Sequence, residues 1–218
     1  MDRILKVKGT GRMKITPDTV SMAIDMREIL PGYAAAVEAS AKNTNALADA
    51  LAGEGFDRGL LKTVSFDVAA KFDYVRDERG NSERRFLGYE YAHELTYDMP
   101  RDNARLSAFL NVLTRFNFGF SFRFTVKDAE RVKNDLLAAA VKDATEKAAV
   151  LAAAAGVKLL APAEIDYSSA DTQVRSRAFM AAEFSDNALA RSSAPVSVDL
   201  NPDDIGVSDT VTVVWTIA

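Results

Sequence analysis

A chain of 218 residues is long enough to bury a sizeable hydrophobic core, as one large domain or two small ones. Its 27 basic residues are nearly balanced by 31 acidic ones, and this net charge of -4 gives no general attraction to nucleic acid, which we do not expect as a partner. The sequence contains no cysteine, so disulfide bonds, thiol catalysis and zinc–thiolate sites are excluded.

The first residues of the chain alternate charged and apolar side chains, unlike the basic start and continuous apolar run of a secretory signal. No later stretch is apolar over the length that a membrane-spanning helix requires. The sequence as written therefore predicts a cytoplasmic protein without a transmembrane segment. If an export signal has been trimmed, the same sequence predicts a periplasmic protein.

A short apolar strand opens the chain and reaches two glycines, Gly9 and Gly11, followed by Thr16, Pro17 and Asp18. We expect a bend at the glycines, because glycine adopts backbone conformations closed to other residues, and a corner at the proline. The glycines lack the third glycine and the downstream Lys-Ser/Thr of a phosphate-binding loop. The pattern therefore predicts a bend and no nucleotide site.

Strict alternation of apolar and polar residues marks several later strands. It covers residues 20–26, 64–74, 87–97 and 116–126, and it returns at 207–217 at the end of the chain. A shorter strand is expected near Glu164–Tyr167. Since successive side chains of a strand point to opposite faces, one-sided alternation predicts an antiparallel-rich sheet with one buried face and a second face that is exposed or lightly covered.

Three helices are predicted between these strands. The first begins at Pro31 and ends at Gly53 with Val37, Thr44, Leu47 and Leu51 on its apolar side. The second follows Pro100 and carries Leu106, Phe109, Leu110 and Leu113. The third and longest is capped by Asp128, ends at Gly156, and carries a buried stripe of Val132, Leu136, Ala140, Ala144, Ala148, Leu151 and Ala155.

The order of elements from Val20 to Val126 is strand, helix, strand, strand, helix, strand, which is the βαββαβ order of a ferredoxin-like unit. The long third helix and the closing C-terminal strands extend this unit. No linker rich in Pro, Gly or Ser separates two halves. We therefore predict an α+β fold in a single domain over residues 1–218.

Two irregular segments interrupt this order. Residues 76–85 hold four arginines and three acidic residues around Gly80, which predicts a solvated hairpin tip rather than a phosphate site. Residues 168–204 are long for a connection, and such segments are usually functional or disordered. Within them, residues 178–184 are expected to form a short apolar helical turn. Its side chains Phe179, Met180 and Phe184 pack on the core or form contacts between subunits.

Few side chains suggest a reaction. His93 is the only histidine and is expected to be half-buried with a local hydrogen bond, the alternative being a general base or pH sensor. Asp199, Asp203 and Asp204 have the composition of a turn more than of a calcium site. The phenylalanines of 116–124 lack the basic surroundings of a nucleobase-stacking surface and are expected in the core. We therefore predict no catalytic residue, no metal site and no cofactor.

Four segments together resemble the SIMPL-domain family, which includes a periplasmic immunogenic antigen of bacteria. They are the Gly9/Gly11 opening with Pro17-Asp18, Gly88-Tyr89-Glu-Tyr91, the alanine-rich helix from Ala144 to Gly156 with its Lys147-Ala148 pair, and residues 201–205 before the closing strand. The resemblance spans nearly the whole chain. It implies an α+β fold, and some members of the family assemble into large homo-oligomeric rings or channel-like bodies. No catalytic residue set comes with it.

Two main hypotheses for the function follow. The first is a non-enzymatic structural or interaction protein that associates with itself through strand edges, helix faces or the 168–204 segment. The second is a small-molecule-binding protein or hydrolase that uses sheet carboxylates such as Asp67, Asp73 or Glu90, which would require a pocket where several acids converge. A signalling adaptor is a third possibility, suggested only by the family member that associates with a signalling kinase.

Overall fold

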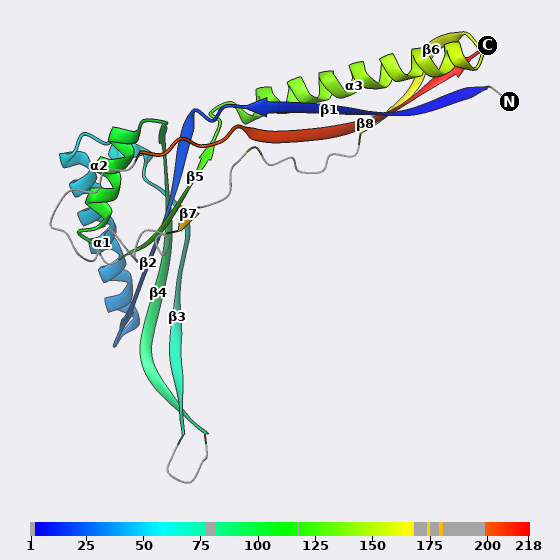
Figure 1. Cartoon of the computed structure of the whole chain (residues 1–218). Helices are drawn as coiled ribbons and strands as arrows, with labels where there is room; N and C mark the ends of the chain where they lie inside the picture. The colour runs from blue at the N-terminus through cyan, green and yellow to red at the C-terminus, as the bar shows by residue number, and fades with distance from the viewer. Residues whose placement is uncertain (1–2, 77–81, 117, 168–173, 175–178, 181–198) are drawn as a thin grey trace. The chain divides into compact units, whose positions relative to one another are not determined.

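A computed structural model of the chain describes residues 3–76, 82–116, 118–167, 174, 179–180 and 199–218 (Figure 1). The fold is mixed α+β, as predicted, and the described residues form three α-helices and two antiparallel sheets. Its backbone contacts divide it into two compact units. The first unit comprises Met1–Asp18, Thr125–Ser176 and Pro202–Ala218, and the second comprises Thr19–Phe124 and Arg177–Asn201. That the whole chain folds as one domain stays a prediction.

The second unit has the predicted βαββαβ order. Its elements are β2 (Thr19–Leu30), α1 (Tyr33–Gly53), a 3₁₀ turn η1 (Arg58–Leu60), β3 (Lys62–Arg76), β4 (Ser82–Pro100), α2 (Asn103–Leu113), β5 (Gly119–Thr125) and β7 (Phe179–Met180). The strands are ordered β3-β4-β2-β5-β7 across the sheet. The first four of these have the strand order of a ferredoxin-like sheet, and β3 lies at its edge.

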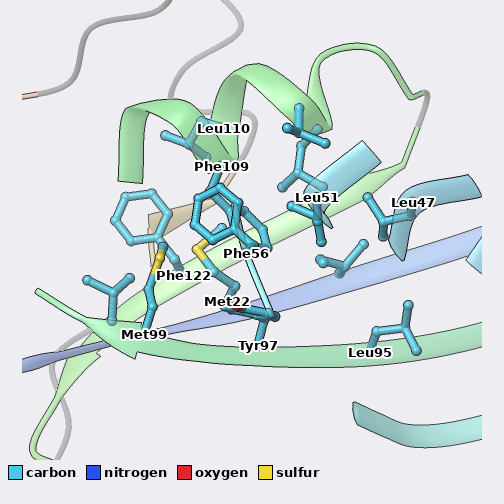
Figure 2. Packing of buried hydrophobic residues seen from close by; sticks show 14 of the residues in the cluster. Met22, Leu47, Leu51, Phe56, Leu95, Tyr97, Met99, Phe109, Leu110 and Phe122 are labelled. Carbon is cyan, nitrogen blue, oxygen red and sulfur yellow. The ribbon is translucent and has the colours of Figure 1, made fainter. Parts of the chain in front are cut away.

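Large apolar side chains fill the space between this sheet and its two helices (Figure 2). Met22 and Tyr97 come from β2 and β4, and Phe56 and Phe109 pack edge to face against each other with ring centroids 5.1 Å apart. The four apolar residues predicted for α2 are all buried: Leu106, Phe109, Leu110 and Leu113. The alternation seen in the sequence thus places one face of β2 and β4 in a core, and the described residues of this unit put no helix on the other face.

The first unit consists of β1 (Ile4–Ile15), α3 (Ala129–Ala154), β6 (Leu159–Asp166) and β8 (Ile205–Ile217). β8 lies in the centre of a three-stranded sheet with β1 and β6 on either side, and α3 packs against β1 and β8. The side chain of Asp128 accepts a hydrogen bond from the backbone N–H of Arg131, 2.9 Å away, and so caps α3 as the sequence predicts.

The two glycines of β1 do not form a bend, contrary to the prediction. β1 continues through Gly9 and Gly11, which pair with Val211 and Asp209 of β8. A Cβ atom at Gly9 would overlap the carbonyl oxygen of Ala140 in α3 and lie 2.6 Å from the amide nitrogen of Ala144. The glycines are therefore explained by contact between two backbones, since only a residue without a side chain leaves room for the helix.

The buried stripe of α3 also differs from the prediction at its C-terminal end. It repeats every four residues through Leu136, Ala140, Ala144, Ala148 and Ala152. Leu151 is 49% exposed and Ala155 is exposed, so neither belongs to it. The alanines lie against the strand that carries the glycines, and the stripe continues in alanine to the end of the helix because only small side chains fit so close an approach.

Two further boundaries are corrected. β5 begins at Gly119, because Phe116 follows the end of α2 and stacks on Phe118 with ring centroids 5.2 Å apart. The helical turn expected at 178–184 is wrong in its first part, because Phe179 and Met180 pair as a strand with Phe122 and Ser121 of β5. Phe184 and the tip of the hairpin, residues 77–81, lie outside the described residues.

Candidate functional site

The distinctive feature of the second unit is the outer half of the β3–β4 hairpin. β4 pairs with β2 only from Tyr89 to Pro100, so its residues from Ser82 to Gly88 pair with β3 alone. The ribbon begins at a bulge where Gly88 adopts a positive φ of 139°. A two-stranded ribbon has no second layer to cover its faces, and its side chains remain accessible unless another molecule covers them.

One face of the β3–β4 hairpin carries a row of aromatic side chains, which runs from the three-stranded part of the sheet onto the ribbon. Phe66, Tyr74 and Phe86 are 46%, 67% and 48% exposed. The ring of Phe86 lies 5.5 Å from that of Phe72 and 5.5 Å from that of Tyr89. We call the five residues Phe66, Phe72, Tyr74, Phe86 and Tyr89 the aromatic row.

The sequence predicts that residues 64–74 have a buried face, and this part of the prediction is wrong. The core lies between the two helices and the strands β2, β4 and β5, whereas β3 is at the edge of the sheet. No described side chain of β3 is buried. The alternation of β3 therefore reports an apolar face that the described residues leave open or only partly covered, which is unusual for a monomeric protein.

His93 lies between α1 and the sheet. Its Nδ1 atom is 2.9 Å from the hydroxyl of Ser40 on α1, and its Nε2 atom is 2.9 Å from the hydroxyl of Thr63 on β3. The side chain is buried, and this burial lowers the pKa of the imidazole below its usual value. The expected local hydrogen bond is present. With hydroxyl partners on both nitrogens and no carboxylate partner among the described residues, the imidazole has the surroundings of a structural residue.

On the face of the sheet opposite the helices, a hollow of about 560 Å³ lies over β2, β3, β4 and β5. Asp25 and Glu94 stand directly opposite each other on neighbouring strands. Arg27 forms two hydrogen bonds of 2.9 Å to Asp25, which raise the pKa of the guanidinium, and the hydroxyl of Ser65 lies 3.5 Å from Glu94. The carboxylates are exposed or half-exposed, which is not the desolvated environment that prepares a carboxyl group for acid–base chemistry.

The three carboxylates that the sequence suggests for an enzyme do not converge. Glu90 forms an ion pair of 2.9 Å with Lys71, and Asp67 is exposed on β3. Asp73 lies farther along the ribbon, where its side chain accepts a hydrogen bond from the backbone N–H of Tyr74. None of them lines the hollow. The two carboxylates that line the hollow are those of Asp25 and Glu94. Both lie at outward-facing positions of alternating strands, but the sequence does not show that they are neighbours unless the register of β2 and β4 is known.

Two of the three acidic residues before the last strand form separate hydrogen bonds. Asp199 accepts a hydrogen bond from the amide of Asn103, and Asp204 accepts one from the hydroxyl of Thr16. Asp203 is exposed. No group of three or more potential metal ligands is found among the described residues, and the helices that the structure describes include none long and apolar enough to cross a membrane.

Two of the three predicted oligomer contacts are described only in part. The backbones of Phe179 and Met180 form β7 at the end of the sheet opposite to β3. Phe184 lies outside the described residues. That these three residues form contacts between subunits stays a prediction. The sequence pattern did not indicate the exposed side chains of the aromatic row as contact residues.

Comparison with models of known families gives a match. The model of the SIMPL family, described as a protein of unknown function (DUF541), matches residues 5–215 and therefore nearly the whole chain. No curated protein matches the sequence.

Proposed function

The chain belongs to the SIMPL family, and from this premise and its exposed surfaces we propose that it is a non-enzymatic structural protein that associates with further copies of itself. One observation carries the proposal. Three side chains of the aromatic row, Phe66, Tyr74 and Phe86, are exposed on the β3–β4 hairpin, whose outer two-stranded half has no covering layer among the described residues. Burying such side chains between subunits releases about 25 cal/mol for each Å² of apolar surface removed from water.

The chemistry of the row is suited to a protein interface. Aromatic residues are enriched in the buried centres of interfaces, where they provide large contact areas with few side-chain torsions to immobilise. The guanidinium carbon of Arg84 lies 3.5 Å from the centre of the Phe72 ring, so a cation already rests on one member of the row. Tyr, Phe and Arg together form the composition expected of contacts that contribute most to binding.

The engagement of the ionisable groups on the two faces of the sheet supports a non-enzymatic role. Asp25 is neutralised by Arg27, and His93 is engaged with hydroxyl groups between α1 and the sheet. The predicted contacts at Phe179, Met180 and Phe184 belong to the same proposal as a second interface, because a protein that forms rings or larger bodies needs two different surfaces.

Sedimentation equilibrium of the purified chain between about 1 and 100 μM tests the proposal. We expect an oligomer whose mass falls in the double variant Tyr74→Ser/Phe86→Ser, since both side chains are exposed and their replacement removes contact area without opening a core. Val150→Ser is the matched control, because Val150 is 69% exposed on α3 and is not part of the ribbon. A wild-type chain that remains monomeric throughout this range would refute self-association.

A further inference from the structure

Among the described residues, the outer edge of β3 is a free edge of the second unit's sheet, whose other end is β7. β3 lies at the end of the strand order and pairs with β4 alone. β3 contains one β-bulge, in which Val64 is the extra residue, because Thr63 and Ser65 pair with the adjacent Leu95 and Glu94 of β4. At the second bulge of this strand pair, beside Lys71 and Phe72, the extra residue is Leu87 of β4. From Ser65 onward β3 therefore presents a regular strand edge, whose unpaired backbone groups can pair with another strand.

The sequence of this edge is complementary to itself. In an antiparallel pair of two β3 strands centred on Ala69, Asp67 stands opposite Lys71 of the second copy, and Phe66 stands opposite Phe72. Each of these pairs occurs twice, because the arrangement is symmetric. The centre consists of Ala69 opposite its own copy and Val68 opposite Ala70, so small side chains lie where the strands meet. Charge and aromatic complementarity thus coincide in this register.

We infer that β3 of one copy pairs with β3 of a second copy about a twofold axis that passes through Ala69 perpendicular to the sheet. This inference rests on the proposed function and identifies the surface and the register through which two copies associate. The two five-stranded sheets then form one continuous sheet, and both pairs of helices cover the same face of it.

A centre at Phe72 also pairs opposite charges, because Lys71 then stands opposite Asp73 of the second copy. In that register Asp67 gains no basic partner, and the carboxylate of Asp73 already accepts a hydrogen bond from the backbone N–H of Tyr74. The remaining registers are less favourable. A twofold axis perpendicular to a sheet keeps each face on its own side, so only registers centred on a residue are allowed. A centre at Asp67 or Lys71 places each of these charges opposite its own copy, and a centre at Ala70 places Asp73 opposite Asp67. A centre at Val68 separates the opposite charges. Like charges directly opposite each other destabilise a strand pair, whereas opposite charges stabilise it.

The side chains are already positioned for this contact. The Nζ atom of Lys71 lies 2.9 Å from the nearer carboxylate oxygen of Glu90, which holds the ammonium group on the face of the sheet without helices. Asp67 of the second copy would approach Lys71 on that same face. On the opposite face, Phe66 and Phe72 would join the two aromatic rows into one continuous apolar surface.

Charge variants test the register. In Asp67→Lys, two lysines face each other at both symmetric sites, and in Lys71→Asp, two aspartates do. We expect each variant alone to dimerise on the order of tenfold to a hundredfold more weakly than the wild type. In an equimolar mixture of the two variants, a lysine of one chain again stands opposite an aspartate of the other at both sites, so the mixture should recover the dimer. This recovery also shows that both variants are folded.

Cysteine cross-linking provides an independent measurement, because the chain contains no cysteine. In Ala69→Cys the two thiols meet across the axis, where opposite Cα atoms of an antiparallel pair are about 4.5–5.5 Å apart, within the range of a disulfide. We expect this variant to form a covalent dimer on mild oxidation. The control is Ser65→Cys on the same edge, whose two copies would be separated by about eight residues, roughly 27 Å, and should not cross-link.

The two proposals fail in different ways. A monomeric wild-type chain would refute self-association itself. A wild type that associates, while Asp67→Lys and Lys71→Asp associate equally well and Ala69→Cys forms no more disulfide than Ser65→Cys, would overturn only the pairing through β3.

Discussion

The two units place helices on a sheet in opposite ways. In the first unit, the alanines of α3 lie against Gly9 and Gly11 of β1, and the two backbones are in direct contact. In the second unit, large side chains such as Phe109 and Tyr97 fill a thick layer between helices and sheet. Close backbone packing tolerates almost no added atom, whereas interlocking side chains leave room for adjustment. The comparison teaches that the first unit is the more sensitive to small increases in volume.

The edge strands β1 and β3 of the two sheets differ as well. On β1 the exposed side chains of the alternating row are Lys6, Lys8, Arg12 and Lys14, and the backbone N–H of Thr10 donates to Asp143 of α3 at 2.7 Å. Like charges and a covering helix protect an edge from further pairing. On β3 the charges alternate in sign and the other face is aromatic. One edge is therefore closed, and the other is suited to a partner.

The largest effect should come from adding one methyl group to β1. Gly9→Ala places a Cβ against the carbonyl oxygen of Ala140, and the helix backbone can yield only by moving as a whole. We expect a loss of at least about 3 kcal/mol in the free energy of unfolding, measured by urea denaturation. The control is Gly206→Ala on β8, where a Cβ meets no atom within 4 Å and the change should stay within about 1 kcal/mol. Equal losses in both variants would contradict close backbone packing.

The next largest loss of stability is expected at Leu136 of α3, and a much smaller one at Leu151 of the same helix. Leu136 is fully buried, so Leu136→Ala should cost about 2–5 kcal/mol through lost burial and the cavity left behind. Leu151 is half-exposed, and Leu151→Ala should cost less than about 1 kcal/mol. Thermal unfolding of both variants followed by circular dichroism measures the difference. A similar drop in melting temperature for the two would show that Leu151 is covered in solution.

An intermediate effect is expected at His93, which binds α1 to the edge strand. Burial lowers the pKa of the folded-state imidazole, so the unfolded chain binds the proton more readily. The stabilisation is therefore complete above the unfolded pKa of about 6.5 and is lost as the pH falls through the lower folded-state pKa. His93→Gln should cost about 1–3 kcal/mol at pH ~8 and should flatten the dependence of stability on pH below about 6.5. If the free energy of unfolding of His93→Gln depended on pH as steeply as that of the wild type, groups other than His93 would cause the dependence.

The smallest effect on stability should follow the loss of the hydrogen bond between α3 and the edge of β1. Asp143→Ala removes the acceptor of the Thr10 N–H and the ion pair with Lys147 on the surface of α3. We expect a decrease of at most a few degrees in melting temperature by differential scanning calorimetry. The four basic side chains still protect the edge, so the variant should not associate more strongly than the wild type. Association that increased with concentration in this variant alone would show that Asp143, not charge, closes the edge.

Most of the fold could be predicted because it follows from local periodicity. The order of strands and helices in the second unit and the cap at Asp128 are confirmed by the structure. The bend at Gly9 and Gly11 could not be predicted correctly, since a glycine that bends the chain and one that admits a neighbouring backbone look the same in a sequence. The exposure of Leu151 depends on where the strands lie under α3, which the spacing of apolar residues does not report.

The candidate surface was predictable only in part. The alternation of residues 64–74 identifies an apolar face, but an edge strand and a central strand produce the same pattern. Only the strand order shows that β3 is at the edge and that its aromatic side chains are exposed. The complementarity about Ala69 is present in the sequence, yet it acquires meaning only when β3 is known to have a free side.

The sequence by itself determined the α+β class, the βαββαβ order and the helix ends, because these depend on interactions between residues that are close in the chain. The tertiary structure alone decided which apolar faces are covered, why β1 requires glycine, and which strand edge remains open. These properties depend on contacts between residues far apart in the chain, and the burial of a side chain is set by what packs against it rather than by its neighbours in sequence.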